Sequence, residues 1–489
     1  MHSTSGTGSD VAAAQADPAS FRDRGNQVRT SPAGVFRLLS AEALEDWRRL
    51  SATSLFQRNT LQGRIARTDE LGGESWRGWP GGERWAGCLR HERIPFVSYP
   101  YEWSFLMLKE AALLHLDLLA QGIEEGLTLK DATPYNVQWK GAAPVFIDIP
   151  SFVALKSGQG WMGYHQFCRM LLYPLLLNAY RGIAFQPLLR ASLEGVPPEQ
   201  CRRMLSWRDL VRPGVFKDVV LQAQLQGLFE RNGARAGRGQ ARDFRRELAD
   251  AGFHSDLIRA NLRRLGKVVA GLNPRGARSA WSRYYQQLSY SGEAQGQKEQ
   301  FVREAVGSAR WPLVWDLGCN TGRFTRLVAP HAECVVSMDS DPDVIDGFFR
   351  ELHAEGVSNV LPLVVDLANP SPGLGWNLRE RRPLWERGKP DLVLALALIH
   401  HLVISANVPL EMLMDWFAEL GGTLLIEWVG KDDPMVRTLL RHKDDQYAEY
   451  TQDHFERLLN RHFRILRQEA LAGGTRALYL ALPLSRAKA

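Results

Sequence analysis

Hydrophobic residues in the C-terminal part of the chain gather in short runs, and each run leads to a polar residue. The runs cover residues 311–315, 333–338, 360–365 and 391–397. The polar residues that follow them are, in order, Asp316, Asp339, Asp366 and the pair His400 and His401. Short apolar runs that alternate with stretches of helical spacing predict an α/β domain with a doubly wound, mostly parallel sheet. Since the carboxyl ends of parallel strands share one edge, we expect these polar side chains to lie together.

A tight loop with the sequence G-C-N-T-G follows the first run, between Gly318 and Gly322. Gly318 allows a sharp backbone turn, and Gly322 lets the next helix start close to the strand and to a ligand. Asp339 comes about 20 residues later, where a carboxylate can accept both ribose hydroxyls of a nucleoside. The loop lacks the G-x-G-x-x-G spacing, which weighs against NAD; a purely structural turn is the other alternative.

The succession of acid, glycine loop, acid, acid and polar turn resembles motifs I to IV of the class I S-adenosylmethionine (SAM) methyltransferases. The resemblance implies a Rossmann-like domain that binds SAM. It implies that the first acid and the loop hold the methionine part, the second acid the ribose, and the third acid the adenine amino group. Asn320 stands where the loop usually has its middle glycine, a substitution that the family tolerates. The cofactor-binding candidates are Asp316, Gly318, Asn320, Gly322, Asp339 and Asp366.

His400 and His401 are the catalytic candidates, because they follow the fourth run, where the family carries residues near the methyl group. Histidine suits a general base near neutral pH. Consecutive residues of a regular strand or helix point in different directions, so we expect only one of them to face the site. A histidine that merely packs at a helix start is the alternative. The turn is not the N/D-P-P-Y/F motif, which weighs against a DNA adenine methylase.

Two further charged residues have two interpretations each. Glu427 ends a fifth apolar run, where it could shape the acceptor pocket or belong to a charged surface loop. Lys298 precedes the first run and could reach the cofactor's carboxylate, although packing or solvation explains it more simply.

The N-terminal half carries a second pattern. Residues 102–121 have apolar positions at helical spacing, and Asp131, Asn136 and Asp148 follow. The D-x-x-x-x-N spacing and the later Asp resemble the C-lobe of the kinase and aminoglycoside-phosphotransferase superfamily, which implies ATP and Mg²⁺ at these three residues. Lys130 departs from the pattern, and no phosphate loop or pairing lysine is identifiable upstream. A degenerate kinase-like domain, an active small-molecule kinase and an unrelated helical domain all remain open.

These patterns predict an α/β protein with two parts. The C-terminal part is a doubly wound, Rossmann-like methyltransferase domain, and the N-terminal part is a mainly helical, kinase-like α+β domain. The predicted boundaries are a disordered tail over 1–33, the kinase-like domain over 34–232, a linker with connecting helices over 233–279 and the methyltransferase over 280–489.

Composition narrows the setting. The net charge of +6, with 60 basic and 54 acidic residues, does not demand nucleic acid. The basic, glycine-rich segment 232–242 lacks interleaved aromatic residues, so we interpret it as a linker. Five scattered cysteines without metal-ligand spacing predict no metal site and a cytoplasmic protein. No apolar run approaches the length of about 20 residues that a membrane span needs.

The whole chain is similar to bacterial SAM-dependent methyltransferases with a kinase-like N-terminal region, including NoeA-related proteins. This similarity implies methyl transfer to an unidentified acceptor, and the kinase-like half favours a hydroxyl of a small molecule or glycan. A bifunctional kinase–methyltransferase and a non-catalytic SAM-binding regulator or scaffold are the alternatives. The oligomeric state is not predicted.

Overall fold

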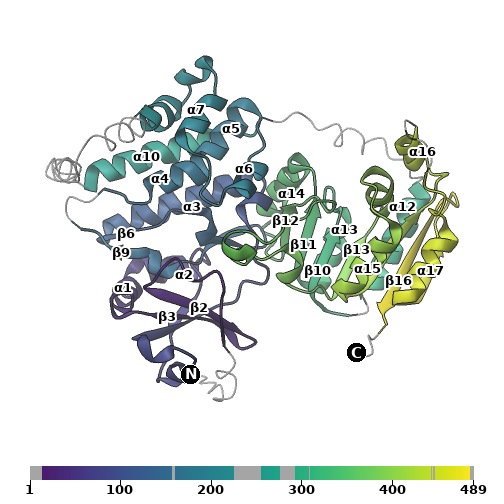
Figure 1. The fold of residues 1–489 in the computed structure, drawn as a ribbon, viewed down its shortest axis with the longest axis horizontal. Coiled ribbons are helices and arrows are strands. Elements are labelled where there is room, and N and C mark those ends of the chain that lie inside the picture. The colour runs from purple at the N-terminus through teal and green to yellow at the C-terminus, as the bar shows by residue number, and fades with distance from the viewer. Residues whose placement is uncertain are drawn as a thin grey trace.

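The computed structural model describes residues 14–156, 160–224, 255–275, 292–307, 309–441, 443 and 446–484. Figure 1 shows two halves that lie side by side, with the N-terminal half in purple and blue and the C-terminal half in green and yellow. Among the described helices, none is long and apolar enough to cross a membrane.

The described C-terminal residues build one seven-stranded sheet. Its strand order is β12-β11-β10-β13-β14-β16-β15. The strands are β10 (Trp311–Leu317), β11 (Ala332–Asp339), β12 (Val360–Val364), β13 (Leu392–Ala395), β14 (Thr423–Val429), β15 (Phe463–Ala470) and β16 (Arg476–Pro483). Strands β10 to β14 run parallel to one another, while β16 pairs antiparallel with both β14 and β15. The predicted doubly wound sheet is confirmed.

Helices cover both faces of this sheet because the chain moves outward from β10 in two directions. They are α12 (Gly292–Gly307), α13 (Arg323–Val328), α14 (Pro342–Glu355), α15 (Leu410–Leu420), α16 (Pro434–Leu440) and α17 (Gln452–His462). Right-handed crossovers place α13 and α14 on one face and α15 on the other. The direction changes between β10 and β13, and a sheet of this kind binds ligands at the carboxyl ends of such strands.

An antiparallel sheet opens the N-terminal half. Its described strands lie in the order β1-β2-β3-β5-β4. They are β1 (Gln15–Ala16), β2 (Asn26–Ser31), β3 (Gly34–Leu39), β4 (Thr68–Glu70) and β5 (Gly87–His91), and α1 (Ala41–Ser51) and α2 (Ser54–Leu61) lie between β3 and β4 in the chain. Residues 14–33 therefore differ from the predicted disordered tail, because β2 pairs along its whole length with β3. Residues 1–13 lie outside the described residues.

A small second core explains the tryptophan-rich stretch between β4 and β5. Trp76, Trp79 and Trp85 are buried together with Phe36 and Leu38 from β3. Their indole rings therefore cover a face of the antiparallel sheet.

Helices make up the rest of this half, around the long helix α3. They are α3 (Phe105–Glu124), α4 (Tyr164–Phe167), α5 (Tyr173–Arg181), α6 (Gln186–Ala191), α7 (Pro198–Met204) and α10 (Ser255–Gly271). Two short antiparallel pairs, β6 (Leu127–Leu129) with β9 (Phe152–Ala154) and β7 (Val137–Lys140) with β8 (Ala143–Phe146), follow α3. The predicted linker contains α10, which packs on α3. The rest of that linker, 233–254 and 276–279, lies outside the described residues, as does 280–291.

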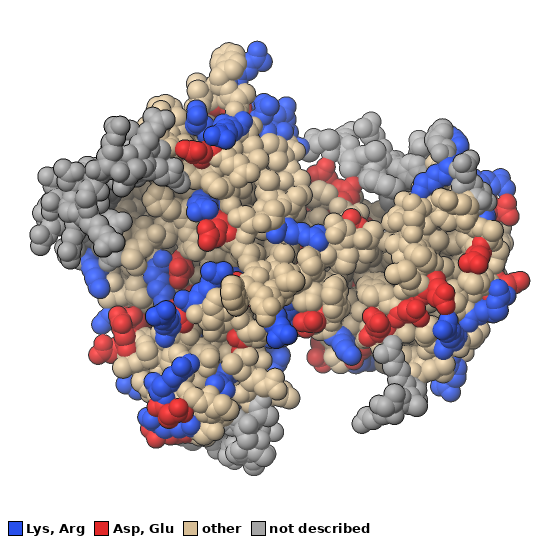
Figure 2. All heavy atoms as spheres, viewed as in Figure 1, with Lys and Arg blue, Asp and Glu red and all other residues tan. Residues whose placement is uncertain are grey.

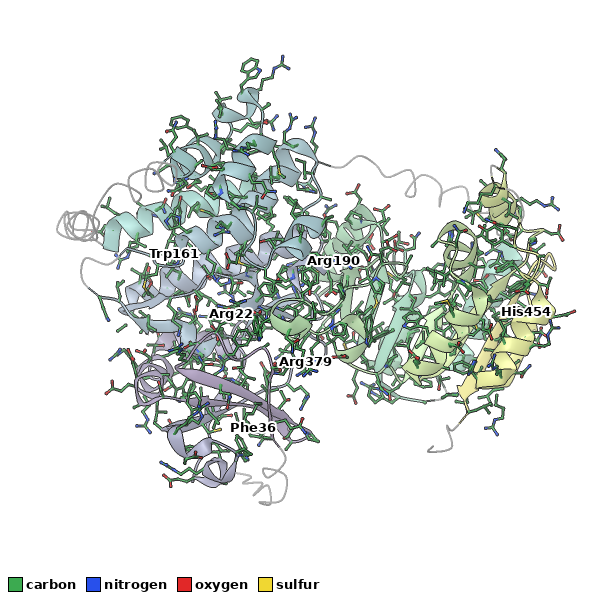
Figure 3. The ribbon with its side chains drawn as sticks, viewed as in Figure 1. Arg22, Phe36, Trp161, Arg190, Arg379 and His454 are labelled. Atoms are coloured by element: carbon green, nitrogen blue, oxygen red, sulfur yellow. The ribbon has the colours of Figure 1, made fainter. Side chains whose placement is uncertain are left out.

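The two halves share one hydrophobic core. Across the junction, Arg387 forms an ion pair of 2.5 Å with Glu102, and both side chains are buried. The indole of Trp139 packs edge-on against Phe349, with ring centroids 5.5 Å apart. Figure 3 labels Arg22, Arg190 and Arg379 in the same region, where the halves meet. The segment between β12 and β13 supplies many of these contacts, so it fastens the sheet domain to the N-terminal half.

Candidate functional site

The first acid, Asp316, ends β10 in a buried position. The Thr325 hydroxyl on α13 donates a 2.5 Å hydrogen bond to the Asp316 Oδ2 atom. Burial raises the pKa of Asp316 to about 6, although this hydrogen bond and the charge of Lys298 oppose the rise. The Asp316 carboxyl group therefore lies near the Lys298 cation, at the edge of the sheet where folds of this kind bind ligands.

The glycine loop has the backbone that the sequence predicted. Gly318 and Gly322 have φ angles of +75° and +77°, in the left-handed region. A Cβ atom on Gly322 would come within 2.0 Å of the Phe348 ring, so only glycine fits. Asn320 has φ +50°, a conformation that asparagine tolerates better than most residues, which explains why it can replace a glycine.

A hydrogen bond ties the loop to the second acid. The backbone N–H of Asn320 donates to Asp339 Oδ2 over 3.0 Å, and the N–H of Asp341 donates to Asp339 Oδ1 over 3.0 Å. Burial raises the pKa of Asp339, and these backbone hydrogen bonds lower it in part. A backbone hydrogen bond thus holds the loop and Asp339 together, and the ribose-binding role of Asp339 stays a prediction.

The third acid has a different environment. Asp366 follows β12 at the same sheet edge, since the N–H of Val365 donates to the Asp339 carbonyl oxygen over 2.8 Å. Its side chain is exposed and accepts a 2.9 Å hydrogen bond from the Ala368 N–H. Asp366 therefore presents its carboxylate to solvent at the rim of the site.

The histidine rings lie next to each other. Their centroids are 4.2 Å apart, and His400 is buried while His401 is mostly so. The two rings lie side by side because the backbone after β13 is neither a regular strand nor a regular helix: Ala397 has φ +52° and a π-helical turn begins at His401. That only one of the two rings faces the site stays a prediction. The Nδ1 atom of His400 has no hydrogen-bond partner among the described residues.

Both imidazoles are neutral at neutral pH. Burial lowers the pKa of His400 well below its usual value, and the charges of His401, Arg476 and Lys298 lower it further. Burial and the charge of Arg476 lower the pKa of His401 to about 4. A neutral imidazole has one N–H and one nitrogen with a lone pair, so both rings are in the protonation state that a proton acceptor needs.

A buried network of four charged side chains surrounds the histidines. Lys298 Nζ on α12 lies 2.6 Å from Glu427 Oε2 on β14. Arg476 on β16 pairs with Glu427 over 3.2 Å and with Asp433 over 2.7 Å. Glu427 and Lys298 are thus neither a surface loop nor a solvated pair. Arg476 was missed, although an arginine at the start of an apolar strand is a signal that could have indicated a buried ion pair.

The residues at this edge fit SAM. The left-handed backbone at Gly318 and Gly322, and the close packing of Gly322 on Phe348, hold the loop in a tight turn at this edge. Asp339 is fixed by two backbone N–H groups and, being a carboxylate, retains further acceptor capacity for ribose hydroxyls. Buried polar atoms without a hydrogen-bond partner among the described residues, such as Asp341 Oδ2 and His400 Nδ1, remain available to a ligand.

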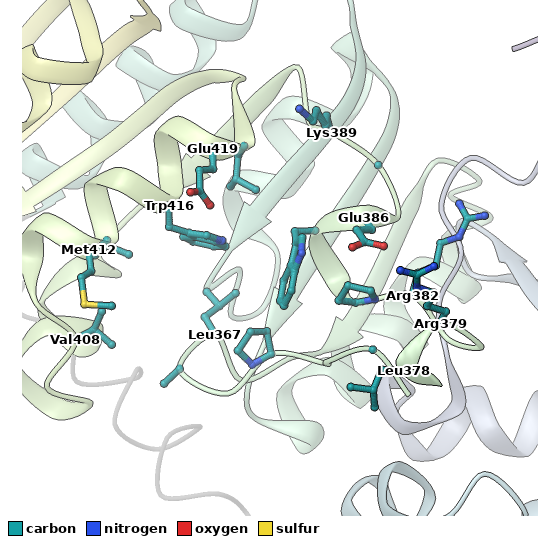
Figure 4. Close-up of a pocket in the computed structure, with 18 of the residues that line it drawn as sticks. Leu367, Leu378, Arg379, Arg382, Glu386, Lys389, Val408, Met412, Trp416 and Glu419 are labelled. Carbon is teal, nitrogen blue, oxygen red and sulfur yellow. The ribbon is translucent and has the colours of Figure 1, made fainter. Parts of the chain in front are cut away.

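A large pocket lies beside these motifs. It has a volume of about 1310 Å³ and lies between the 367–389 segment and α15, as Figure 4 shows. Leu367 and Leu402 line it, and they directly follow Asp366 and His401 in the chain. The lining also includes two tryptophans, three basic residues and two acids: Trp385, Trp416, Arg379, Arg382, Lys389, Glu386 and Glu419. None of the cofactor candidates lines this pocket. The pocket reaches the motif edge through Leu367 and Leu402.

The N-terminal candidates lie in a different environment. The Asp148 carboxylate accepts a 2.8 Å hydrogen bond from the Arg37 guanidinium on β3. Burial and the nearby charge of Asp148 raise the pKa of Asp131. Asn136 is buried, and its Nδ2 atom has no hydrogen-bond partner among the described residues. Arg37 thus pairs with one oxygen of the Asp148 carboxylate, and no group of three or more His, Cys, Asp or Glu side chains in the described part of the chain is placed to hold a metal ion.

Comparison with known proteins gives one relative over nearly the whole length. The nodulation protein NoeA of Rhizobium meliloti (strain 1021) is 34% identical over 462 residues, which cover 94% of each chain. No family model matches the chain.

Similar solved structures cover about two fifths of the chain. The N-methyltransferase NodS from Bradyrhizobium japonicum WM9 has a TM-score of 0.30 and 13% identity, over 40% of this chain and 99% of NodS. The magnesium protoporphyrin IX methyltransferase ChlM from Synechocystis PCC 6803, with bound SAH, has a TM-score of 0.29 and 18% identity, over 41% of this chain and 92% of ChlM.

The relative that matches over nearly the full length shows the family of the chain. The motifs and their place in the sheet indicate the type of the C-terminal domain. The glycine loop and the acids meet at the carboxyl edge of a seven-stranded sheet whose strand order and single reversed strand are those of class I methyltransferases. The chain belongs to the family of the nodulation protein NoeA, and its C-terminal half has the fold of the class I SAM-dependent methyltransferases.

Proposed function

We propose that the protein transfers the methyl group of SAM to a hydroxyl group of a small molecule or glycan. The observation that carries this proposal is the pair of buried, neutral histidines at the sheet edge that also carries the glycine loop. A hydroxyl must lose its proton as its oxygen forms the new bond, and a neutral imidazole can accept that proton.

In this proposal the motif residues hold the cofactor, which supplies a methyl group already activated by a sulfonium. Asp316 and the loop between Gly318 and Gly322 hold the methionine part. Asp339 accepts the ribose hydroxyls, and Asp366 accepts the adenine amino group. Their task is to position the cofactor, because the displacement requires the acceptor oxygen, the methyl carbon and the sulfur of SAM to lie in one line.

The histidines and the charged network then act on the acceptor. His400 Nδ1 or a nitrogen of His401 accepts the hydroxyl proton. Burial is the largest cause that keeps both rings unprotonated. The positive charge of Arg476 adds to this effect at both rings and that of Lys298 at His400, while Glu427 and Asp433 compensate these charges within the buried network. Burial keeps bulk water away from the reacting oxygen.

The neighbouring pocket supports an extended acceptor. Its tryptophan rings can stack on the apolar faces of sugar rings, and its arginine, lysine and glutamate side chains can pair with hydroxyl or acidic substituents. A volume of about 1310 Å³ exceeds that of usual small-ligand sites, which are about 300–1000 Å³. We therefore place the part of the acceptor that is remote from the methylated hydroxyl between the 367–389 segment and α15.

The test is methyl transfer from isotope-labelled SAM to fractionated cell extracts, with mass spectrometry of the products. The proposal expects label on a hydroxyl of a small molecule or glycan, and His400→Asn and His401→Asn to lower turnover while SAM still binds. Label only on protein or RNA would refute this acceptor class. Binding of SAM without any transfer would instead favour a regulator or scaffold.

We further propose that the N-terminal half is a degenerate, non-catalytic kinase-like domain. Its antiparallel sheet precedes the long helix α3, and the β6–β9 and β7–β8 pairs flank Asp131 and Asn136. The Arg37–Asp148 ion pair argues against nucleotide chemistry there. Calorimetry with ATP and Mg²⁺ should give no binding heat. Saturable binding that Asp148→Ala abolishes would contradict this and favour the bifunctional alternative.

A further inference from the structure

One end of the N-terminal half carries exposed apolar side chains on η8 (Trp207–Val211), on η9 (Phe216–Val220) and directly after η9. Trp207 is 75% exposed, Val211 91% and Phe216 57%. Leu210 and Leu221 are exposed beside them. We call the exposed residues of the 202–224 segment the tip surface; every residue in this range belongs to the described part of the chain. Large apolar residues gathered in one short segment mark an interaction site rather than ordinary surface.

The charges of the tip surface are of one sign. Its exposed charged residues are Arg202, Arg203, Arg208, Arg212 and Lys217. The two acids of the segment, Asp209 and Asp218, are buried. Asp218 is held by Arg264 from α10 over 2.6 Å, so it does not neutralise the outer face. In Figure 2, blue spheres gather among tan ones at the end of the molecule where Figure 1 labels α7.

Buried side chains and hydrogen bonds from α5 hold the backbone of the tip surface in place. Val215, Val219 and Val220 are buried and anchor it to the core. The Tyr180 hydroxyl donates to the Pro213 carbonyl oxygen over 3.0 Å, and the Tyr173 hydroxyl donates to the Asp218 carbonyl oxygen over 2.5 Å. The apolar side chains are therefore presented outward by a fixed backbone, which reduces the entropy lost on docking.

We propose that the tip surface docks on an anionic lipid bilayer. Tryptophan and phenylalanine partition into the interfacial region of a membrane, and aliphatic side chains such as Val211 and Leu210 gain from contact with acyl chains. Arginine and lysine beside them are attracted to acidic headgroups. A nucleic acid would satisfy the cations and stack on Trp207, but it offers no apolar partner for Val211, the most exposed of these residues. The charge and the aliphatic exposure together therefore favour lipid, independently of the proposed acceptor.

The experiment is vesicle flotation of the full chain. Vesicles of phosphatidylcholine with 30 mol% phosphatidylglycerol (about this fraction suffices for a strongly negative surface) are compared with pure phosphatidylcholine vesicles. We expect binding to the anionic vesicles only, and weakening at high salt because surface charges are screened. No binding to anionic vesicles at low salt overturns the proposal.

Matched variants separate the two contributions. Arg202→Gln, Arg208→Gln and Lys217→Gln together should weaken vesicle binding about 100-fold, at about fivefold per cation. Trp207→Ser with Val211→Ser should weaken it about tenfold. The controls are Leu61→Ser on α2, where Leu61 is 89% exposed, and Arg310→Gln, which is also exposed; both should bind as the parent does. Unchanged binding of the Trp207→Ser/Val211→Ser variant overturns the proposal, as does complete displacement by an oligonucleotide or a dimer that forms through the tip surface.

Discussion

Lys298 Nζ lies 2.6 Å from Glu427 Oε2, and both side chains are almost fully buried. The pair joins α12, which precedes the sheet, to the carboxyl end of β14, and it lies beside the histidines. Lys298 Nζ also lies 4.6 Å from the centre of the Phe324 ring on α13. A buried ion pair of this kind fixes the spatial relationship between the elements that frame the methyltransferase site.

Removing one partner of this pair should destabilise the protein. Lys298→Met removes one cation from Glu427 and leaves its pair with Arg476, and breaking a buried ion pair costs about 3–5 kcal/mol. Urea unfolding measures the change. The matched control is the exposed pair of Arg461 and Glu411, where Arg461→Met should cost less than about 1 kcal/mol. Equal effects at both sites would contradict the buried network.

The close packing of Gly322 against Phe348 predicts the effect of a methyl group added at this position. Gly322→Ala combines a left-handed backbone with a clash against Phe348 and should lower the free energy of unfolding by about 2 kcal/mol or more while also weakening SAM binding. Gly356 at the end of α14 is the control, since it has φ +70° but nothing within 4 Å of an added Cβ. Gly356→Ala should therefore cost only the backbone strain of about 1 kcal/mol and leave SAM binding unchanged. A Gly322→Ala variant that matches Gly356→Ala in both measurements would refute the close fit.

The histidine environment predicts a pH dependence. The folded protein lowers the pKa of His401 to about 4, while an unfolded histidine has a pKa of about 6.5. Between these values the unfolded chain binds a proton that the folded chain does not, so this residue makes the protein lose stability as the pH falls from about 6.5 to about 4. Asp316 acts in the opposite direction, because its pKa is raised to about 6. Through this residue the protein loses stability as the pH rises from about 4 to about 6.

The difference between variants isolates the histidine contribution. His401→Asn should lose less stability than the parent between pH 6.5 and pH 4.5 in urea unfolding. His454→Asn on α17 is the control and should follow the parent. A parallel pH profile for His401→Asn and the parent would mean that His401 is not held neutral by its surroundings.

Local patterns made the central site predictable. A strand, a glycine loop and a helix are adjacent in sequence, so the spacing from Asp316 through Gly322 to Asp339 carries its own geometry. The buried network was harder, because Arg476 and Glu427 are 49 residues apart and meet only through antiparallel pairing of β14 with β16. Similarly, the sequence of β2 is polar and resembles a tail until β3 is known to pair with it.

The most direct test is calorimetric titration of SAM into the full chain and two variants. The account predicts saturable binding with one site per chain. Asp339→Asn should weaken it about 10- to 100-fold, since a hydrogen bond to a charged group contributes about 1.5–3 kcal/mol. Asp343→Asn, an exposed acid on α14, should leave it unchanged. A parent protein that gives no binding heat at millimolar SAM, or an Asp339→Asn variant that binds as tightly as the parent, would contradict the account.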